Sequence, residues 1–205
     1  MGRSQEAAAE TRRNIVTAAA AEFRARGFDN VGLAELMSQL GLTHGGFYRH
    51  FENKDQLITE ACKEAFELIY HPWPKNIKEH SKKALKHVVS RYLSPEYRDN
   101  PTESCAFVCV GSDIARASEP TKRVATEAYQ NLVSLLVRAL PVGDHEAMSH
   151  EASIIACSLI GALLVARMLD DRKMSNNVMN SMKERILNTY ESRYDPGDSQ
   201  PSGDT

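Results

Sequence analysis

Residues 41–54 read GLTHGGFYRHFENK, a run that combines two helix-capping residues with glycine, histidine and aromatic side chains. Thr43 and Asn53 are residue types that commonly accept hydrogen bonds at helix N-termini. We therefore expect a very short helix after Thr43 and a longer one after Asn53. Residues 33–40 carry leucine and methionine at helical spacing, and Gly41 ends that segment. Two short helices joined by a glycine-containing turn predict a helix-turn-helix motif.

Outward from this motif, the spacing of apolar residues predicts an all-α chain of about nine helices. In the first helix, expected from about residue 10 to 26, apolar side chains recur every four residues: Ile15, Ala19 and Phe23. The fourth helix ends at His71-Pro72-Trp73-Pro74, because neither proline fits inside a helix. The other helices are expected near residues 85–92, 105–117, 124–139, 145–170 and 178–190, with a loop at 95–101.

These elements divide the chain into four segments. Residues 10–55 form a three-helix head, and residues 56–194 form a larger helical domain. Residues 1–9 are expected to be a flexible lead. The tail, residues 195–205, contains only Asp, Pro, Gly, Ser, Gln and Thr, a composition typical of disorder.

The composition fits a folded protein without a bulk charge signature. Of the 205 residues, 42% are hydrophobic and 25% are charged, which are ordinary globular values. The net charge is -2, and the first 55 residues hold seven basic and seven acidic side chains. The sequence therefore has no bulk electrostatic signature of nucleic-acid binding, and any such function must depend on local geometry.

Signatures of catalysis and of metal binding are missing from the sequence. There is no GxSxG, GxGxxG, HExxH or P-loop run, which argues against an enzyme. His44 and His50 fall on different faces of a helix and are unsuited to share a metal ion. The cysteines are scattered without zinc-site spacing: Cys62, Cys105, Cys109 and Cys157. We expect no cofactor, no metal and reduced thiols; a helical enzyme or scaffold without DNA binding is the alternative class.

One segment is apolar enough to raise the question of a membrane. Residues 152–166 carry no charge, but they are shorter than the roughly 20 residues that a spanning helix needs. We expect a packing helix there. The first residues lead into a polar, alanine-rich helix rather than the apolar core of a secretion signal, which favours a cytoplasmic protein.

The run at residues 41–54 resembles the signature of the TetR family of transcriptional repressors. The matching residues are Gly41, Leu42, Thr43, Gly45, Phe47, Tyr48, His50, Phe51, Asn53, Lys54 and Leu57, preceded by Ile15, Ala18, Ala19, Phe23 and Gly27. The resemblance covers about residues 11–60 and implies a repressor that binds a palindromic operator as a homodimer and is released by a small-molecule effector. Gly32 and Leu33 depart from the family, which commonly has a threonine pair there. The effector, the operator and the direction of the response are not encoded in any motif.

The resemblance places double-stranded operator DNA against the third helix. A helix that enters the major groove must be thin at its leading end, and Gly45 and Gly46 provide this. Tyr48, His50 and Lys54 are suited to phosphate oxygens. The predicted DNA contacts are Thr43, His44, Gly45, Gly46, Phe47, Tyr48, Arg49, His50 and Lys54.

Two aromatic positions near this helix have alternative roles. Phe51 is expected in the core of the head. Phe47 is open between the core and an apolar contact to a thymine methyl group.

The resemblance assigns the last two helices to dimerisation and the middle helices to an effector cavity. Small residues recur every four positions in the eighth helix, which permits close approach of two backbones, although packing inside one chain explains the same pattern. The predicted interface residues are Ser153, Cys157, Gly161, Val165, Val178, Met182 and Ile186. The candidate cavity residues are Trp73, Tyr92, Cys105, Phe107, Cys109 and Tyr129, for which ordinary core burial is the alternative.

Cys105 carries a second hypothesis, that of a redox or electrophile sensor. Some TetR-like repressors that sense electrophiles carry a reactive cysteine at the start of this helix, and a helix N-terminus favours the thiolate. Cysteine is also among the most often buried residue types, and Glu103 opposes thiolate formation. Packing against the core or the cavity is therefore the competing role.

Overall fold

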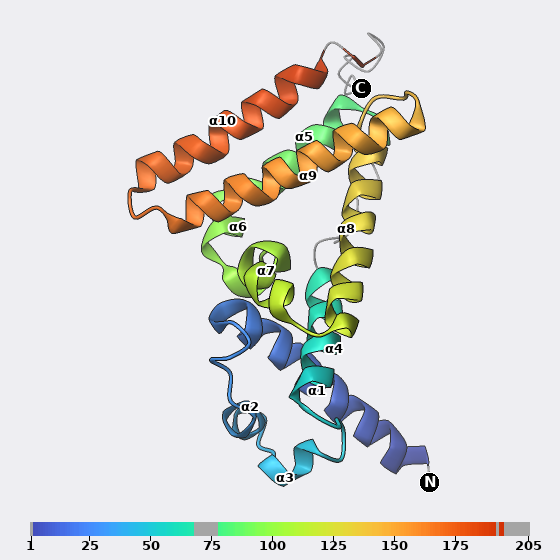
Figure 1. Cartoon of the computed structure of the whole chain (residues 1–205), viewed down its shortest axis with the longest axis vertical. Coiled ribbons are helices and arrows are strands. Elements are labelled where there is room, and N and C mark those ends of the chain that lie inside the picture. Colours follow the sequence, from blue (N-terminus) through green and yellow to red (C-terminus); the bar gives the residue numbers. More distant parts are fainter. Residues whose placement is uncertain (1, 68–77, 192, 195–205) are drawn as a thin grey trace, which may run out of the picture. The chain divides into compact units, whose positions relative to one another are not determined.

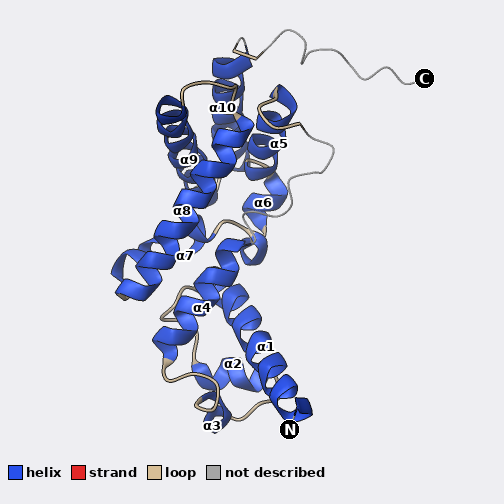
Figure 2. Ribbon diagram, turned by 90° about the vertical axis from the view of Figure 1, so that its right-hand side faces the viewer, coloured by secondary structure: helices blue, strands red, loops and turns tan. Residues whose placement is uncertain are grey.

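The computed structural model describes residues 2–67, 78–191 and 193–194, and all regular structure in them is helical (Figures 1 and 2). The all-α prediction is therefore confirmed. The chain divides into two compact units, one of residues 1–69 with 100–128 and one of residues 70–99 with 129–205. The predicted break at residues 71–74 and the predicted tail at 195–205 lie outside the described residues.

The first unit contains the head together with a stretch from the middle of the chain. Its elements are α1 (Gly2–Arg26), α2 (Leu33–Gln39), α3 (His44–Phe47), α4 (Lys54–Glu67), the 3-10 turn η2 (Pro101–Glu103), α7 (Ala106–Arg116) and the first part of α8 (Glu119–Ala139). Residues 2–9, expected as a flexible lead, are the first turns of α1. The apolar stripe begins only at Ile15, so the exposed start of this helix carried no periodic signal.

The helices of the head close around a shared core. Its fully or nearly fully buried side chains are Ile15, Ala19, Phe23, Leu36, Met37, Phe47, Phe51 and Leu57. Each large apolar side chain buried in this way contributes about 1.5–3 kcal/mol, so the core fixes α2 and α3 against α1. Arg12 covers one edge, with its guanidinium carbon 4.6 Å from the centroid of the Phe51 ring. Its Nη2 atom donates to Oε1 of Glu60 at 2.6 Å.

The head is tied to residues 100–128 by polar contacts. Buried Arg24 donates to the carbonyl oxygen of Thr102. The backbone N–H of Phe28 donates to Oδ2 of Asp113 over 3.1 Å. The compact unit therefore extends beyond residues 10–55. Polar groups at and just after the end of α1 find their hydrogen-bond partners in residues 100–128.

The second unit is built from α5 (Lys82–Tyr92), α6 (Pro95–Asp99), the rest of α8, α9 (His145–Met168) and α10 (Arg172–Glu191). The loop predicted at residues 95–101 is wrong, because α6 and the start of η2 occupy it. Pro95 and Pro101 each stand at the first position of their helix. Proline, which has no backbone N–H, is tolerated there because the N–H of the first helical residue would have no acceptor within the helix.

α9 is the apolar centre of the second unit. It is 24 residues long and, by length and composition alone, could cross a membrane, with 39% of its most apolar window buried. Its buried residues are Ala152, Ile155, Ala156, Leu159, Ala162, Leu163 and Ala166. α10 packs along it, and Tyr190 of α10 donates its hydroxyl to Glu151 of α9. One such helix is weak evidence for a membrane, since core helices pass the same test.

Candidate nucleic-acid interface

The turn between α2 and α3 depends on a glycine in the left-handed region. Gly41 has φ +69, a conformation that L side chains rarely adopt. Its N–H donates to the carbonyl of Ser38 at 3.0 Å, and the N–H of Leu42 donates to that of Met37 at 2.9 Å. These bonds close the end of α2 and redirect the chain into α3.

α3 is anchored from its own N-terminus. Thr43 is the N-cap, and its Oγ1 accepts a hydrogen bond from the N–H of Gly46 at 3.2 Å, as the sequence predicted. A Cβ on Gly46 would lie 3.4 Å from this same oxygen, which is a tight contact. Asn53 caps α4 in the same way, accepting from the N–H of Gln56 at 2.9 Å.

The side chain of Phe47 attaches α3 to the core of the head. This side chain is 0% exposed, and its ring stacks on that of Phe51 with centroids 5.3 Å apart. The assignment of Phe47 to a thymine methyl is therefore corrected, because the ring has no surface to offer a base. Phe51, also buried, has the core position that we expected.

The opposite side of α3 is open. Thr43, His44, Gly45 and Arg49 are exposed, and the Tyr48 side chain is 60% exposed. The rings of His44 and Tyr48 meet edge to face with centroids 5.8 Å apart. A Cβ added at Gly45 would meet nothing within 4 Å, so this chain itself does not require a glycine there. The bare backbone leaves room for another molecule to approach.

His50 and Lys54, two of the basic residues that follow α3, each make a hydrogen bond within the head. Lys54 is half-buried, and its Nζ donates to the carbonyl of Phe28 at 2.7 Å. An ammonium has three N–H donors, so this bond leaves capacity for a phosphate. His50 is half-buried, and its carbonyl accepts from Nε of Arg12 at 3.2 Å. Phosphate contacts by these residues stay predictions.

A groove of about 520 Å³ runs between the start of α1 and the α2–α3 turn. Its walls include Ala7, Ala8 and Thr11 of α1, together with Thr43, Gly46, Arg49 and His50. The α1 residues were missed from sequence, because helical periodicity identifies the buried face of a helix and gives no signal for an exposed one.

The predicted effector residues fall in different parts of the chain. Cys105 is fully buried and Phe107 is half-buried in the first unit, where the Phe107 ring lies 4.5 Å from that of Phe66. Cys109 is half-buried, with its thiol 3.5 Å from the carbonyl of Pro101. Tyr92 is buried and Tyr129 half-buried in the second unit. Trp73 lies outside the described residues.

The predicted dimer residues are mostly accessible. On α9, Cys157 is exposed, Val165 is 44% exposed, and Ser153 and Gly161 are half-buried. On α10, Val178 and Met182 are half-buried. Ile186 is only 5% exposed, because its side chain packs inside its own unit. Within the part of the chain that the structure describes, no group of three or more His, Cys, Asp or Glu residues is arranged to hold a metal ion.

Comparisons with known proteins agree with this geometry. Residues 15–61 match the family described as "Bacterial regulatory proteins, tetR family". The chain is 41% identical over 56 residues to the HTH-type transcriptional regulator TtgR of Pseudomonas putida, covering 27% of each protein. It is 28% identical over 91 residues to the uncharacterized regulator YerO of Bacillus subtilis, covering 44% of this chain and 31% of YerO. The matches thus span less than a third of these curated relatives.

Solved structures match over most of the chain. A TetR-family regulator from Agrobacterium tumefaciens aligns with a TM-score of 0.71 at 16% identity, over 89% of this chain and 98% of that one. The reduced form of Escherichia coli NemR aligns with a TM-score of 0.70 at 16% identity, over 87% and 96%. AibR, solved with isovaleryl coenzyme A and operator DNA, aligns with a TM-score of 0.61 at 17% identity. The alignment covers 86% of this chain and 97% of AibR. At such identities the likeness shows the fold.

A capped recognition helix on an all-α chain of this fold defines a helix-turn-helix transcriptional regulator. The head matches the TetR family over residues 15–61, and most of the chain shares the fold of a TetR-family regulator.

Proposed function

We propose that this regulator is a repressor that binds a palindromic operator as a homodimer in the cytoplasm and is released by a small-molecule effector. The observation that best supports DNA binding is that α3 has one buried side and one exposed side. Buried Phe47 holds the helix against the core and the Thr43 hydroxyl caps its N-terminus, while His44, Gly45 and Tyr48 are exposed.

The roles of these surface residues follow from their chemistry. The exposed imidazole of His44 and the bare backbone at Gly45 are suited to base edges in the major groove. Tyr48 and Arg49 flank them with a hydroxyl and a guanidinium, both suited to phosphate oxygens. Lys54 at the start of α4 adds an ammonium at the edge of this surface. Phosphate contacts set the register, and base contacts set the sequence preference.

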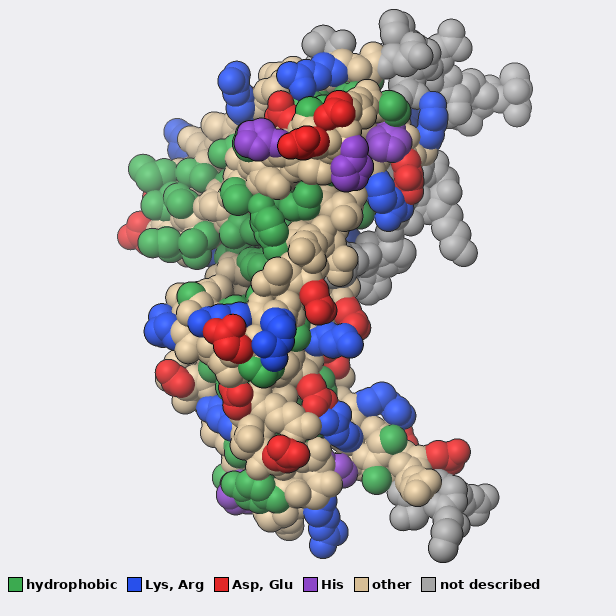
Figure 3. Space-filling view, turned by 45° about the vertical axis from the view of Figure 1, so that its right-hand side comes forward, with side chains coloured by type: hydrophobic (Ala, Val, Ile, Leu, Met, Phe, Trp, Pro, Cys, Tyr) green, Lys and Arg blue, Asp and Glu red, His purple; other side chains and the backbone are tan. Residues whose placement is uncertain are grey.

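An exposed apolar stripe on α9 supports the homodimer. Ile154, Leu164, Val165 and Met168 are 50%, 42%, 44% and 75% exposed. Positions 154, 157, 161, 164 and 168 alternate steps of three and four, the spacing of a helix-packing seam. Figure 3 shows hydrophobic side chains gathered over α9 and α10 on the face it presents. Two copies that join through this stripe would present two heads to two half-sites.

Small-molecule control is supported by relatives rather than by a bound ligand. AibR was solved with isovaleryl coenzyme A, and a regulator from Saccharomonospora viridis with choline. We propose that Tyr92 and Tyr129, a buried and a half-buried aromatic of the second unit, take part in effector binding.

Cysteine sensing is the second candidate, and the position of Cys105 favours it. Cys105 is the N-cap of α7, where a thiolate would meet the positive end of a helix. Its side chain is 0% exposed, so a reagent must reach it through a local opening. Packing in the core remains its competing role.

Operator binding is tested with the full chain and labelled DNA from directly upstream of its own gene. We expect saturable, salt-dependent binding by the wild type. Tyr48→Ala should weaken binding by about 1–3 kcal/mol without loss of helicity, because the side chain is exposed. Binding that is no tighter than to unrelated DNA would exclude this operator. Equal affinity of the variant would remove α3 from the interface.

Cysteine sensing is tested by adding a quinone or hypochlorite to the complex. Release that persists in Cys157→Ser and disappears in Cys105→Ser supports the sensor, because Cys157 is the exposed thiol and Cys105 the buried one. Release that is unaffected by Cys105→Ser, or absent from the wild type, leaves Cys105 with a packing role.

A further inference from the structure

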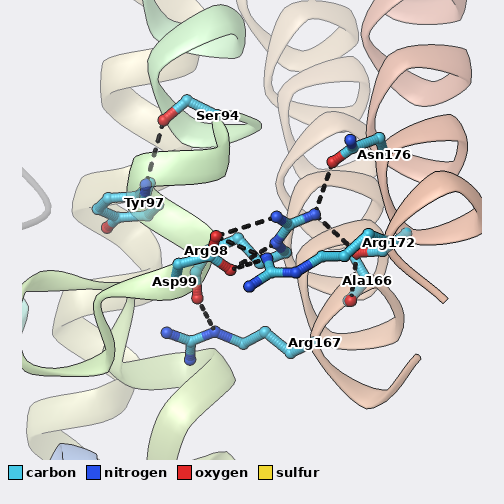
Figure 4. A network of polar contacts seen from close by, with 9 residues as sticks. Ser94, Tyr97, Arg98, Asp99, Ala166, Arg167, Arg172 and Asn176 are labelled. Carbon is cyan, nitrogen blue, oxygen red and sulfur yellow. Dashed lines mark hydrogen bonds and ion pairs between the residues drawn. The ribbon is translucent and has the colours of Figure 1, made fainter. Parts of the chain in front are cut away.

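A polar pocket in the second unit is lined by three arginines. It has a volume of about 300 Å³ and lies where α6, the end of α9 and the start of α10 meet (Figure 4). The lining residues are Arg98, Asp99, Ala166, Arg167, Leu169, Arg172 and Ser175. Three guanidinium groups therefore share the lining with one carboxylate.

Arg98 is a fixed part of the wall. It is only 5% exposed, although it carries a full positive charge. Its Nε and Nη2 atoms donate to the carboxylate of Asp99 at 2.7 and 3.0 Å. Its Nη1 atom donates to Oγ of Ser175 at 2.8 Å and to Oδ1 of Asn176 at 2.7 Å. Contacts to both α6 and α10 thus hold this guanidinium in one orientation.

Arg172 and Arg167 complete the basic lining. Arg172 is 69% exposed, and its Nη1 atom donates to both oxygens of Asp99 at 2.8 and 2.7 Å. Arg167 donates from Nε to the carbonyl of Arg98 at 2.8 Å. The neighbouring Arg98 holds the pKa of Asp99 well below its usual range, so this carboxylate is ionised at neutral pH. The guanidinium groups of Arg98 and Arg172 thus share the single negative charge of Asp99.

Asp99 is the one carboxylate among the lining residues that the structure describes. Asp171 caps α10, with Oδ1 accepting from the N–H groups of Lys173 and Met174 at 2.8 and 3.0 Å. Glu96 lies on α6, where hydrogen bonds from its own backbone N–H and from Ser94 lower its pKa. The lining therefore keeps an excess of positive charge.

We propose that this pocket binds an oxyanion, a phosphate or carboxylate group either free or carried by a small molecule. Guanidinium groups present N–H donors in a planar fork that matches two oxygens of such a group. Like charges gathered in a partly enclosed pocket repel more strongly than in water, and a second anion offsets that repulsion. The volume is at the lower end of the range for small-molecule sites, roughly 300–1,000 Å³.

The site is distinct from α3 and from the aromatic residues proposed for the effector. Its occupant would join α6 to the α9–α10 turn and stabilise the second unit. The proposal does not depend on operator binding, so it is tested without DNA.

The direct test follows the ³¹P NMR line of inorganic phosphate as full-length protein is added at constant ionic strength. We expect saturable broadening. Thermal unfolding in phosphate should give a matching stabilisation, with the unfolding constant lowered about elevenfold at ten times the dissociation constant. Acetate and glycerol phosphate, added as competitors, identify the source. Displacement by acetate points to a carboxylate, and stronger displacement by the ester than by phosphate points to a carried group.

Three variants separate a binding site from a purely structural cluster. Arg172→Gln should weaken phosphate binding about tenfold, whereas Arg185→Gln, an exposed arginine on the same helix, should leave it unchanged. Asp99→Asn should tighten phosphate binding, because it removes the competing carboxylate. The proposal is overturned by unsaturable broadening in the wild type, by Arg172→Gln binding as the wild type does, or by unchanged affinity in Asp99→Asn.

Discussion

The exposed faces of α3 and α9 have opposite chemistry. On α3 the outward residues are His44, Gly45 and Tyr48, which are polar, bare or amphipathic. On α9 they are aliphatic, and Met168 is the most exposed at 75%. A polar surface suits a hydrated polyanion, whereas an apolar surface gains most when it is removed from water.

The two faces are also positioned by different means. α3 is a four-residue helix, too short to be stable alone, and it depends on the Thr43 cap and on the buried ring of Phe47. α9 has 24 residues and a full buried side of its own. Substitutions should therefore act on the head through its anchors, and on α9 through its surface.

Phe47→Ala should have the largest effect, because it removes a fully buried ring. We expect the free energy of unfolding to fall by about 3–5 kcal/mol, measured by urea denaturation. Tyr48→Ala, one residue away and exposed, should stay within about 0.5 kcal/mol of the wild type. Similar losses in the two variants would break the division of α3 into an anchored and an open side.

Gly161→Arg tests the α9 face. A Cβ at Gly161 meets nothing within 4 Å, so the long side chain should be accommodated in one copy and obstruct a second. We expect the dimer dissociation constant to rise by about 100-fold or more, roughly 2.7 kcal/mol, seen as monomers by light scattering. Ser134→Arg, at an exposed site on α8, is the control. A wild type that is monomeric at micromolar concentration would contradict the proposed interface.

Thr43→Ala removes the anchor at the other end of α3. The N–H of Gly46 would lose its acceptor, and we expect a loss of about 1 kcal/mol in unfolding free energy. Thr43→Ser keeps the hydroxyl and should behave as the wild type. A full loss in the serine variant would show that the methyl group, and not the cap, stabilises α3.

Lys54→Ala tests the charged edge of the head. If its ammonium contacts one phosphate, the slope of log affinity against log salt should decrease by about 0.9, for all DNA sequences alike. Lys63→Ala changes an exposed lysine on the same helix and should leave the slope unchanged. An unchanged slope in Lys54→Ala would limit this residue to its bond with the Phe28 carbonyl.

The smallest effect concerns the Arg26–Glu35 pair that joins α1 to α2. Hydrogen bonding by Arg26, at 2.6 Å, lowers the pKa of Glu35 from about 4.5. A lowered folded-state pKa stabilises the protein above the unfolded value, and the stabilisation is lost as the pH falls through the folded one. Glu35→Gln should therefore reduce the difference in melting temperature between pH 6 and pH 3. An identical difference in both proteins would show that the pair contributes nothing.

Much of the head followed from local sequence. The Thr43 and Asn53 caps and the glycine turn were found where predicted, because each depends on hydrogen bonds between residues at most five apart. The apolar run of residues 152–166 likewise predicted α9, since a long helix repeats its pattern several times.

The periodicity of apolar residues did not predict the details of the short helices. Phe47 is buried and the adjacent Tyr48, at the C-cap of α3, is exposed, and one turn of helix contains no repeat that would distinguish the two positions. α6, five residues long and started by a proline, read as a loop for the same reason.

The sequence alone determined the location and caps of the recognition helix, the helical class and the apolar helix, because all of these are recorded in residues close along the chain. Only the tertiary structure decided which side chains meet across long separations. Phe28 donates a hydrogen bond to Asp113, Lys54 donates one to the carbonyl of Phe28, and Arg98 donates one to Ser175. Such pairs form when packed helices bring distant segments together, and no spacing within a segment specifies its partner in another.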